Sequence, residues 1–457
     1  MNRRELLKNA AIGMSAISLP GLSASEPLQI SHFPAKVKRV IFLFLHGGPS
    51  HVDTFDFKPV LQKNHGRSYR YRGVRFDNRN QSTLAKLFAS PFPFKKHGQS
   101  GQWVSSLFPK QAEIVDDLCF LRGMHTEGVA HGPATLFLHT GSTNLLRPSI
   151  GSWISYGLGT ENKNLPAFVS LFPSLVKGGQ RNYGNAFLPS SHQGISLGHA
   201  GLPVEQASIP FLNDGLRREN IQETHFKNLI RLNNLQVENA FQKDKITGAQ
   251  RSFELARAMQ KEKSVLDISN ETQSIKDLYG IDKPETRRYG TMCLLARKLS
   301  EKGVRYVQVN YSDNHANPGF DQHTDLKAGH TKHARAVDQP IAALIRDLKQ
   351  RGLLDETLVV CTGEFGRTPY STDNGRDHNP FGFTSWLAGG GLKKGFSYGY
   401  TDDVGRRAVE GKVHTRDLHA TMLHLLGLDH EMLTFRFGGR DFRLTETEGK
   451  VIRSILN

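Results

Sequence analysis

The chain has 457 residues, of which 22% are charged and 38% hydrophobic, and its formal net charge at pH 7 is +16. This composition is typical of a globular protein with a sizeable core and excludes a low-complexity chain. The positive charge favours anionic partners, but the basic residues are spread along the chain and form no nucleic-acid module, so we expect no nucleic-acid partner.

Residues 1–25 are expected to be an export signal. The basic run RRELLK (3–8) precedes a short apolar stretch (10–22) and the small residues Ser-Ala-Ser at 23–25. This order is typical of a secretory signal, and paired arginines followed by leucines resemble the twin-arginine type. The apolar stretch is too weak for a stable membrane span. We therefore expect a periplasmic or otherwise exported protein with no integral membrane segment after signal removal; the alternative is a frayed N-terminal helix.

The strongest strand signal lies in residues 38–46. The uninterrupted apolar run Val40–Leu45 predicts a central strand that is buried on both faces. His46 ends the run, two glycines follow, and Asp53 comes shortly after. His46 and Asp53 are therefore candidate metal ligands at a strand exit. The alternative is an Asp/Ser turn that caps the next helix.

Residues 60–110 form a basic stretch that is predicted to be rich in loops. Five arginines lie between positions 67 and 79, and FPFKKHG follows at 92–98. We interpret this stretch as a solvated face, and the alternative is one wall of an anion-binding cleft.

Residues 118–141 are predicted to start as a strand and to continue as a helix. His131 is placed just before the N-terminus of that helix. A helix N-terminus stabilises anions and depresses the pKa of a nearby nucleophile. His131 is therefore a further candidate site residue.

Helices and strands alternate through much of the remaining chain. Strands are predicted at 167–172, 306–311, 357–361 and 385–391, and helices at 289–302, 332–351 and 417–427. This order predicts a mostly parallel sheet with helices on both faces. Residues 203–280 are polar, charged and helical in period, so we expect two or three surface helices inserted into a single domain at 26–457.

A second pair of metal-type residues follows the strand at 306–311. Asp321 and His323 are two residues apart, and side chains with this spacing point to the same side of an extended backbone. A metal chelate requires that arrangement, and Asp and His are ligands for zinc and for harder divalent ions. The alternative is a hydrogen-bonded Asp–His pair in a loop.

The stretch 357–380 carries the largest group of candidate residues. A buried strand is followed by Glu364 and Arg367, and a glycine-bearing loop then brings Arg376 and His378. Ligands bind beyond the carboxyl ends of strands in open α/β sheets. These residues therefore predict a metal site that faces an anion, and the alternative is a solvated loop with local ion pairs.

The signal becomes stronger when the strand exits are combined. If these strands are neighbours in one sheet, their exits converge on one edge, where divalent ions about 4 Å apart can clamp the oxygens of an ester. Arginine is suited to a bidentate grip on the remaining negative charge. The expected cofactor is a divalent metal, with zinc first and calcium, magnesium or manganese as alternatives. The candidate metal ligands are Asp321, His323, Glu364, His378, Asp53 and His46.

Several motifs together resemble the domain-of-unknown-function family 1501, which comprises exported bacterial proteins grouped with the alkaline phosphatase and sulfatase superfamily. The resemblance covers essentially the whole mature chain. It implies a three-layer α/β/α sandwich with a mostly parallel central sheet, and it brings no known substrate. The motifs are GGPSHVDTFDFKP, ARKLSEKGVRYVQV with FDQH, TGEFGRTP, GRDHN, LAGGGLKKG and DLHATMLHLLGLDH.

The wider superfamily implies roles for individual residues. The segment HGPATLFLHTG (131–141) is similar to the sulfatase signature, with His131 at the position of the nucleophilic cysteine. The resemblance therefore implies that His131 is either a metal ligand or a nucleophile. Glu364 and Phe365 stand where superfamily members carry an Asp–His pair, and His378 resembles the last histidine ligand. Histidines at positions expected to be anionic favour one bound ion over two.

We therefore expect an exported metal-dependent hydrolase of phosphate or sulfate esters, which acts on anionic small-molecule or polysaccharide substrates. The alternative is a non-catalytic periplasmic binding or accessory protein that retains the fold. The expected catalytic residues are His131, Arg367 and Arg376.

Overall fold

The computed structural model describes residues 31–72, 82–206, 262–313, 318–371 and 373–457, together with a few separate residues between 224 and 258. The expected export signal at 1–25 and most of the expected helical insertion at 203–280 lie outside these residues.

Within the described residues, nine strands form the central sheet, and β1 (Arg39–Leu45) lies in its middle. β1 pairs in parallel with β10 (Thr357–Thr362) on one side and β9 (Tyr306–Tyr311) on the other. The remaining strands are β15 (Phe396–Tyr398), β6 (Cys119–His125), β14 (Phe383–Ala388), β7 (Phe168–Leu171), β8 (Ile195–Leu197) and β18 (Val413–His414). Only β14 among these strands runs antiparallel to its neighbours. The predicted mostly parallel sheet is confirmed.

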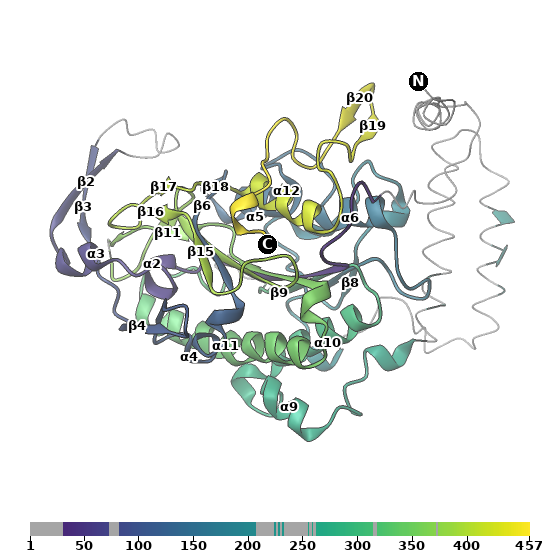
Figure 1. The fold of residues 1–457 in the computed structure, drawn as a ribbon, viewed down its shortest axis with the longest axis horizontal. Coiled ribbons are helices and arrows are strands. Elements are labelled where there is room, and N and C mark those ends of the chain that lie inside the picture. The colour runs from purple at the N-terminus through teal and green to yellow at the C-terminus, as the bar shows by residue number, and fades with distance from the viewer. Residues whose placement is uncertain are drawn as a thin grey trace, which may run out of the picture.

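Helices cover both faces of this sheet (Figure 1). α10 (Pro284–Glu301) and α11 (Leu326–Gln350) lie on one face, and α5 (His131–Thr140), α6 (Ile150–Leu158) and α12 (Thr415–Leu425) lie on the other. Alternate residues of β1 serve the two layers, because successive side chains of a strand point to opposite faces. Ile41 and Leu43 join the core beneath α10 and α11, whereas Phe42 and Phe44 join the core beneath α5, α6 and α12. The three-layer α/β/α sandwich is confirmed.

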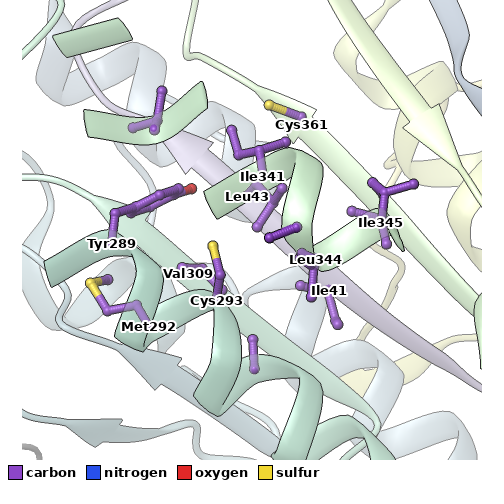
Figure 2. Close-up of a cluster of buried hydrophobic side chains, with 14 of the residues drawn as sticks. Ile41, Leu43, Tyr289, Met292, Cys293, Val309, Ile341, Leu344, Ile345 and Cys361 are labelled. Atoms are coloured by element: carbon purple, nitrogen blue, oxygen red, sulfur yellow. The ribbon is translucent and has the colours of Figure 1, made fainter. Parts of the chain in front are cut away.

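The side chains beneath α10 and α11 form one of the two large cores that flank the sheet. Figure 2 shows Ile341 and Leu344 of α11 lying over Ile41 and Leu43 of β1, and all four side chains are fully buried. Burial of each such side chain contributes about 1.5–3 kcal/mol. Cys293 lies in the same cluster, and all three cysteines of the chain are buried free thiols. The strand ends therefore extend from a part of the sheet whose side chains are fully buried.

Some element boundaries differ from those predicted. α11 begins at Leu326 and not at residue 332, and α5 begins at His131 itself. The strand expected at 385–391 ends at Ala388, because Gly389 has a positive φ of 127° that breaks the extended backbone. The stretch 60–110, expected to be rich in loops, contains two hairpins, namely β2 (Ser68–Arg72) with β3 (Ser82–Leu87) and β4 (Phe94–His97) with β5 (Gln102–Ser105).

Short elements complete the described fold: α2 (His51–Thr54), α3 (Pro59–Lys63), α4 (Pro109–Ala112), α9 (Gln273–Tyr279), β11 (Gly366–Arg367), β12 (Tyr370–Ser371), β13 (His378–Asn379), β16 (Tyr400–Thr401), β17 (Ala408–Glu410), β19 (Phe435–Phe437) and β20 (Arg440–Phe442). Among the described helices, none is both long and apolar enough to cross a membrane.

Candidate metal centre

Four strand exits meet at the carboxyl edge of the sheet. β1, β9 and β10 are parallel neighbours, and β6 has the same direction because β14 runs antiparallel between β6 and β10. Residues that follow all four strands come together there. The expected convergence of the strand exits is confirmed.

Three ligand-type atoms form a compact triangle at this edge. Asp321 Oδ1 lies 3.1 Å from His323 Nε2 and 3.3 Å from His378 Nε2. The two histidine nitrogens are 3.1 Å apart. Ligands about 2.1 Å from a tetrahedral zinc ion lie roughly 3.4 Å from one another. The spacing of the triangle therefore fits three ligands of one ion.

His131 adds a fourth ligand-type atom, and a third nitrogen, beside the triangle. Its Nε2 lies 3.1 Å from Asp321 Oδ1 and makes no hydrogen bond in the described part of the chain. Its Nδ1 lies 2.5 Å from Glu364 Oε1. Burial opposes a charge on His131, but the adjacent carboxylates of Asp321 and Glu364 raise its pKa above the ordinary value. The surroundings therefore favour a positive charge at this position, and a metal ion that replaces the proton on Nε2 would supply that charge.

Outer contacts orient two of these histidines. His378 Nδ1 donates to the Val129 carbonyl at 2.7 Å, which leaves Nε2 as the acceptor atom that faces Asp321. Glu364 holds His131 in the same way through Nδ1. Metal-ligating histidines almost always bond a carboxylate or a carbonyl through their other nitrogen. The buried ring of Phe365 lies against His131 and His378, with centroid separations of 5.0 and 4.5 Å.

Glu364 is held by backbone groups of the loop after β1. The Gly47 N–H lies 3.0 Å from Oε1 and 3.1 Å from Oε2, and the Gly48 N–H donates to Oε2 at 3.2 Å. A side chain at Gly47 would clash, since its Cβ would lie 2.5 Å from the Phe320 backbone nitrogen. Burial opposes ionisation of Glu364, but its bond to His131 lowers the pKa to about 2. Glu364 is therefore an ionised anchor for His131.

Ligand atoms of one ion are roughly 3 Å or more apart when their bonds are about 2.1 Å long. The 2.5 Å separation between Glu364 and His131 Nδ1 fits a hydrogen bond and not a shared ion. In this geometry Glu364, predicted as a metal ligand, stands behind the candidate ligand His131. Glu364 also forms a second candidate group with His46 and His131, whose ligand-type atoms lie within 4.8 Å of one another.

The triangle is open on one side. The side chain of Asp321 is 3% exposed and that of His378 is 18% exposed, whereas that of His323 is 47% exposed. Catalytic zinc sites keep a position for water or substrate, and structural zinc sites are closed. A metal ion held here would therefore be accessible to water or a ligand on the side of His323. Burial opposes ionisation of Asp321, but the adjacent histidines hold its pKa well below the ordinary value.

Arg367 is fully buried and already engaged. Its Nε donates to the Gly48 carbonyl at 3.0 Å, and its Nη2 donates to the Gly47 carbonyl and, at 2.6 Å, to Asp321 Oδ1. Its Nη1 donates to the Arg376 carbonyl at 3.0 Å. We predicted that Arg367 grips an anion, but the geometry favours a different role. Arg367 holds Asp321 in place and links the loops that follow β1, β9 and β10.

Arg376 is engaged in the same manner. It forms two bonds with Asp53, 2.6 Å from Nε to Oδ2 and 3.1 Å from Nη2 to Oδ1, and it also donates to the carbonyls of Thr368 and Phe88. Both partners are fully buried. Burial would raise the pKa of Asp53, but Arg376 lowers it below the ordinary value. Asp53, predicted as a metal ligand, and Arg376, predicted to bind an anion, therefore form a buried ion pair with each other.

His46 lies next to the centre without a hydrogen bond. Its side chain is 1% exposed, and neither ring nitrogen has a hydrogen-bond partner in the described residues. Nε2 is 4.0 Å from Glu364 Oε1, and burial lowers the pKa of His46 to about 4. His46 is thus a neutral imidazole behind the triangle, and the predicted His46 and Asp53 do not lie together at one ion.

Three residues contribute to the centre through their backbone, so their side chains gave no indication of this role in the sequence. Val129, Gly47 and Gly48 act through backbone carbonyl and N–H groups. Because Gly47 and Gly48 carry no side chains, their backbone can lie close to the Glu364 carboxylate. Val129 was not predicted, because any residue at that position offers a carbonyl.

A comparison with curated protein sequences gives no match. Among solved structures, the chain is similar to lipoteichoic acid synthase LtaP from Listeria monocytogenes, with 11% identity and a TM-score of 0.38 over 98% of this chain and 82% of that chain. It is also similar to PsFucS1 sulfatase from Pseudoalteromonas sp., with 11% identity and a TM-score of 0.34 over 87% and 69% of the two chains. A third similarity is to the C-terminal periplasmic domain of EcEptC from Escherichia coli in complex with Zn, with 11% identity and a TM-score of 0.38 over 91% and 88%. We draw no activity from similarity at this level.

The family model described as "Protein of unknown function (DUF1501)" matches residues 37–456. The match includes the whole sheet and every residue of the candidate metal centre. It also agrees with the resemblance seen in the sequence motifs. The chain therefore belongs to the DUF1501 family of proteins of unknown function.

Proposed function

We propose that this protein is a hydrolase of phosphate or sulfate esters that uses one divalent metal ion. The observation that supports the proposal is the triangle of Asp321 Oδ1, His323 Nε2 and His378 Nε2, whose sides are 3.1–3.3 Å. Three imidazoles and one carboxylate suit zinc better than calcium or magnesium, which prefer oxygen ligands. Manganese is the next candidate.

Each residue has a defined task in this proposal. Asp321, His323, His378 and His131 would hold the ion, which would supply Lewis acidity and lower the pKa of a coordinated water. Glu364 and the Val129 carbonyl keep the lone pairs of His131 and His378 directed at the ion. His323 forms the exposed side, from which an ester approaches. His131 acts as a ligand and not as a covalent nucleophile, because its free nitrogen faces Asp321.

One observation favours a second candidate, a periplasmic binding or accessory protein without catalysis. Arg367 and Arg376 were expected to hold the anionic group of the ester, but their guanidinium nitrogens donate to backbone carbonyls and to Asp321 and Asp53. The metal ion itself would then be the main attraction for an anion.

Metal analysis and turnover together separate the two candidates. The purified protein should contain about one equivalent of zinc by mass spectrometry of its metals, and it should hydrolyse an aryl phosphate or an aryl sulfate. The variant His323→Ala should lose both properties. One equivalent of metal without turnover of either ester would support the binding protein. Less than one equivalent, with no turnover after addition of zinc or manganese, would reject the hydrolase.

We also propose export by a twin-arginine signal, supported by the run RRELLK at 3–8 and the apolar stretch behind it. The variant that carries lysine at Arg3 and Arg4 should remain in the cytoplasmic fraction, whereas the unchanged chain should appear in the periplasm without its first residues. Equal export of both chains would contradict the twin-arginine route.

A further inference from the structure

A groove of about 810 Å³ opens between the end of β3 and the first turns of α11. Phe88 and Pro91 form one wall, and Lys327, Lys332 and Arg335 form the other. We infer that this groove is a second subsite, which binds a neighbouring anionic group of a polymeric ester. The inference rests on the proposed function, because the ester to be cleaved would lie at the metal centre.

The groove and the metal centre share a wall. Asp325 and Asn374 line the groove. Asp325 is two residues beyond His323, and Asn374 is two residues before Arg376. A backbone bridge between Thr324 and Asn374 joins these segments. A chain of sugar rings that leaves the exposed side of His323 would therefore enter the groove within a short distance.

The basic side chains of the groove are available for a ligand. Lys327, Lys332 and Arg335 are exposed, and none of them takes part in an ion pair or a side-chain hydrogen bond within the described residues. Two acidic groups, Asp325 and Glu285, also line the groove, so its positive excess is modest. The groove alone fits a single anionic group.

The small sheet of β12, β3 and β2 adjoins the groove, because Phe88 follows the last residue of β3, and this sheet carries further basic side chains. Arg70 lies opposite Leu84 in the register, and Leu84 is 62% exposed, so this face is turned to solvent. Lys86, two residues further along β3, points to the same face. Leu87 points to the other face and is buried.

Arg70 and Lys86 likewise lack ion-pair partners among the described residues. Phe88 follows Lys86 by two residues and lines the groove, so the exposed face leads into it. The cationic track comprises Lys327, Lys332, Arg335, Arg70 and Lys86.

A track of five separated cations matches a polymer with repeated charges better than a small monoester, which would occupy the metal centre alone. The occupant that fits is a polysaccharide with repeated sulfate or phosphate groups, because sugar rings would also lie against Phe88 and Pro91 in the groove. The loss of the three groove cations, each of which makes only a weak exposed contact, should therefore weaken binding of the polymer roughly tenfold.

The test compares two triple variants with the same loss of charge. One carries K327Q, K332Q and R335Q in the groove. The control carries K36Q, K163Q and K302Q, which are exposed positions just before strands at the opposite edge of the sheet. Binding of dextran sulfate is measured by calorimetry, with uncharged dextran and a DNA oligonucleotide as comparison probes. Metal content and turnover of an aryl sulfate and an aryl phosphate are measured in parallel.

The groove variant should bind dextran sulfate about tenfold more weakly than the control, with metal content and aryl ester turnover unchanged. Equal binding by both variants, or tighter binding of DNA than of dextran sulfate, would overturn the inference. The unchanged protein could turn over neither aryl ester while the groove variant binds dextran sulfate more weakly than the control. That result would uphold the subsite and contradict only the hydrolase. Aryl ester turnover together with equal dextran sulfate binding by the two variants would support the hydrolase and contradict the subsite.

Discussion

Arg367 Nη2 lies 2.6 Å from Asp321 Oδ1, the oxygen on which the nitrogens of His131, His323 and His378 converge. The same guanidinium donates to the carbonyls of Gly47 and Gly48 after β1. The exits of three adjacent strands are thereby fixed relative to one carboxylate. Arginine is suited to this task because its planar fork directs several donors at once.

The variant Arg367→Lys should bind zinc about 10–100-fold more weakly, because loss of a group that orients a ligand typically has this effect. Lysine keeps the charge but cannot reach two carbonyls and the carboxylate together. Competition with a fluorescent zinc chelator measures the change. Arg436→Lys is the matched control, since Arg436 is exposed and, among the described residues, forms an ion pair with Asp441 alone. Unchanged zinc affinity in the Arg367 variant would show that Asp321 needs no such support.

Asp53→Asn should lower the free energy of unfolding by about 3–5 kcal/mol, because it leaves the buried charge of Arg376 without its partner. Zinc content should stay the same. Urea denaturation with and without EDTA should show an equal loss in both conditions. Asp441→Asn, at an exposed pair, should cost less than about 1 kcal/mol. Loss of zinc without loss of stability in EDTA would instead identify Asp53 as a ligand.

His323→Ala should remove the metal with little effect on the metal-free fold. The side chain is half-exposed, and surface substitutions usually change stability by no more than about 0.5 kcal/mol. Zinc at a hundred times its dissociation constant should stabilise the unchanged protein by about 2.7 kcal/mol and the variant not at all. Thermal unfolding with zinc and with EDTA measures both effects. His97→Ala, a change on the β4 strand, should respond to zinc as the unchanged protein does.

Asp338 gives a pH dependence that is separate from the metal centre. Burial raises its pKa from 3.8 to about 6, against the hydrogen bonds from the Lys110 and Gln111 N–H groups at 2.8 and 2.9 Å. Between about pH 4 and pH 6, Asp338 is therefore protonated in the folded protein and ionised in the unfolded chain. Its stabilising contribution is complete below about pH 4 and disappears as the pH rises through about 6.

Asp338→Asn should remove this dependence. The difference in unfolding free energy between the unchanged protein and the variant should fall by on the order of 2–3 kcal/mol between pH 4 and pH 6.5. Urea titrations at closely spaced pH values in EDTA measure it. A difference that stays constant over this range would mean that Asp338 ionises as it does in the unfolded chain.

The sheet and its strand exits were predictable because they depend on local patterns. The run Val40–Leu45 is apolar at every position, which only a strand covered on both faces requires. The spacing of Asp321 and His323 likewise placed both side chains on one side, and the structure brings both to the triangle. Each of these patterns is contained in a few consecutive residues of the sequence.

The roles of the arginines could not be predicted, because they depend on partners far along the chain. Arg376 bonds Asp53 across 323 residues, and Arg367 bonds the Gly47 carbonyl across 320. A charged loop after a strand looks the same in sequence whether its arginines face a ligand or the protein interior. The presence of Phe365 where a histidine is expected was visible in the sequence, and its ring lies close to Gly48 and packs against His378.

The triangle draws its ligands from two chain segments, and His323 and His378 are 55 residues apart. A bound ion would join the two ends of this span as a reversible cross-link of the folded state, because its binding free energy adds to the free energy of folding. The strength of such a link follows the supply of free zinc and not the redox state of the compartment. Resistance to proteolysis of the loop between Glu364 and His378 would then report the metal supply around the protein.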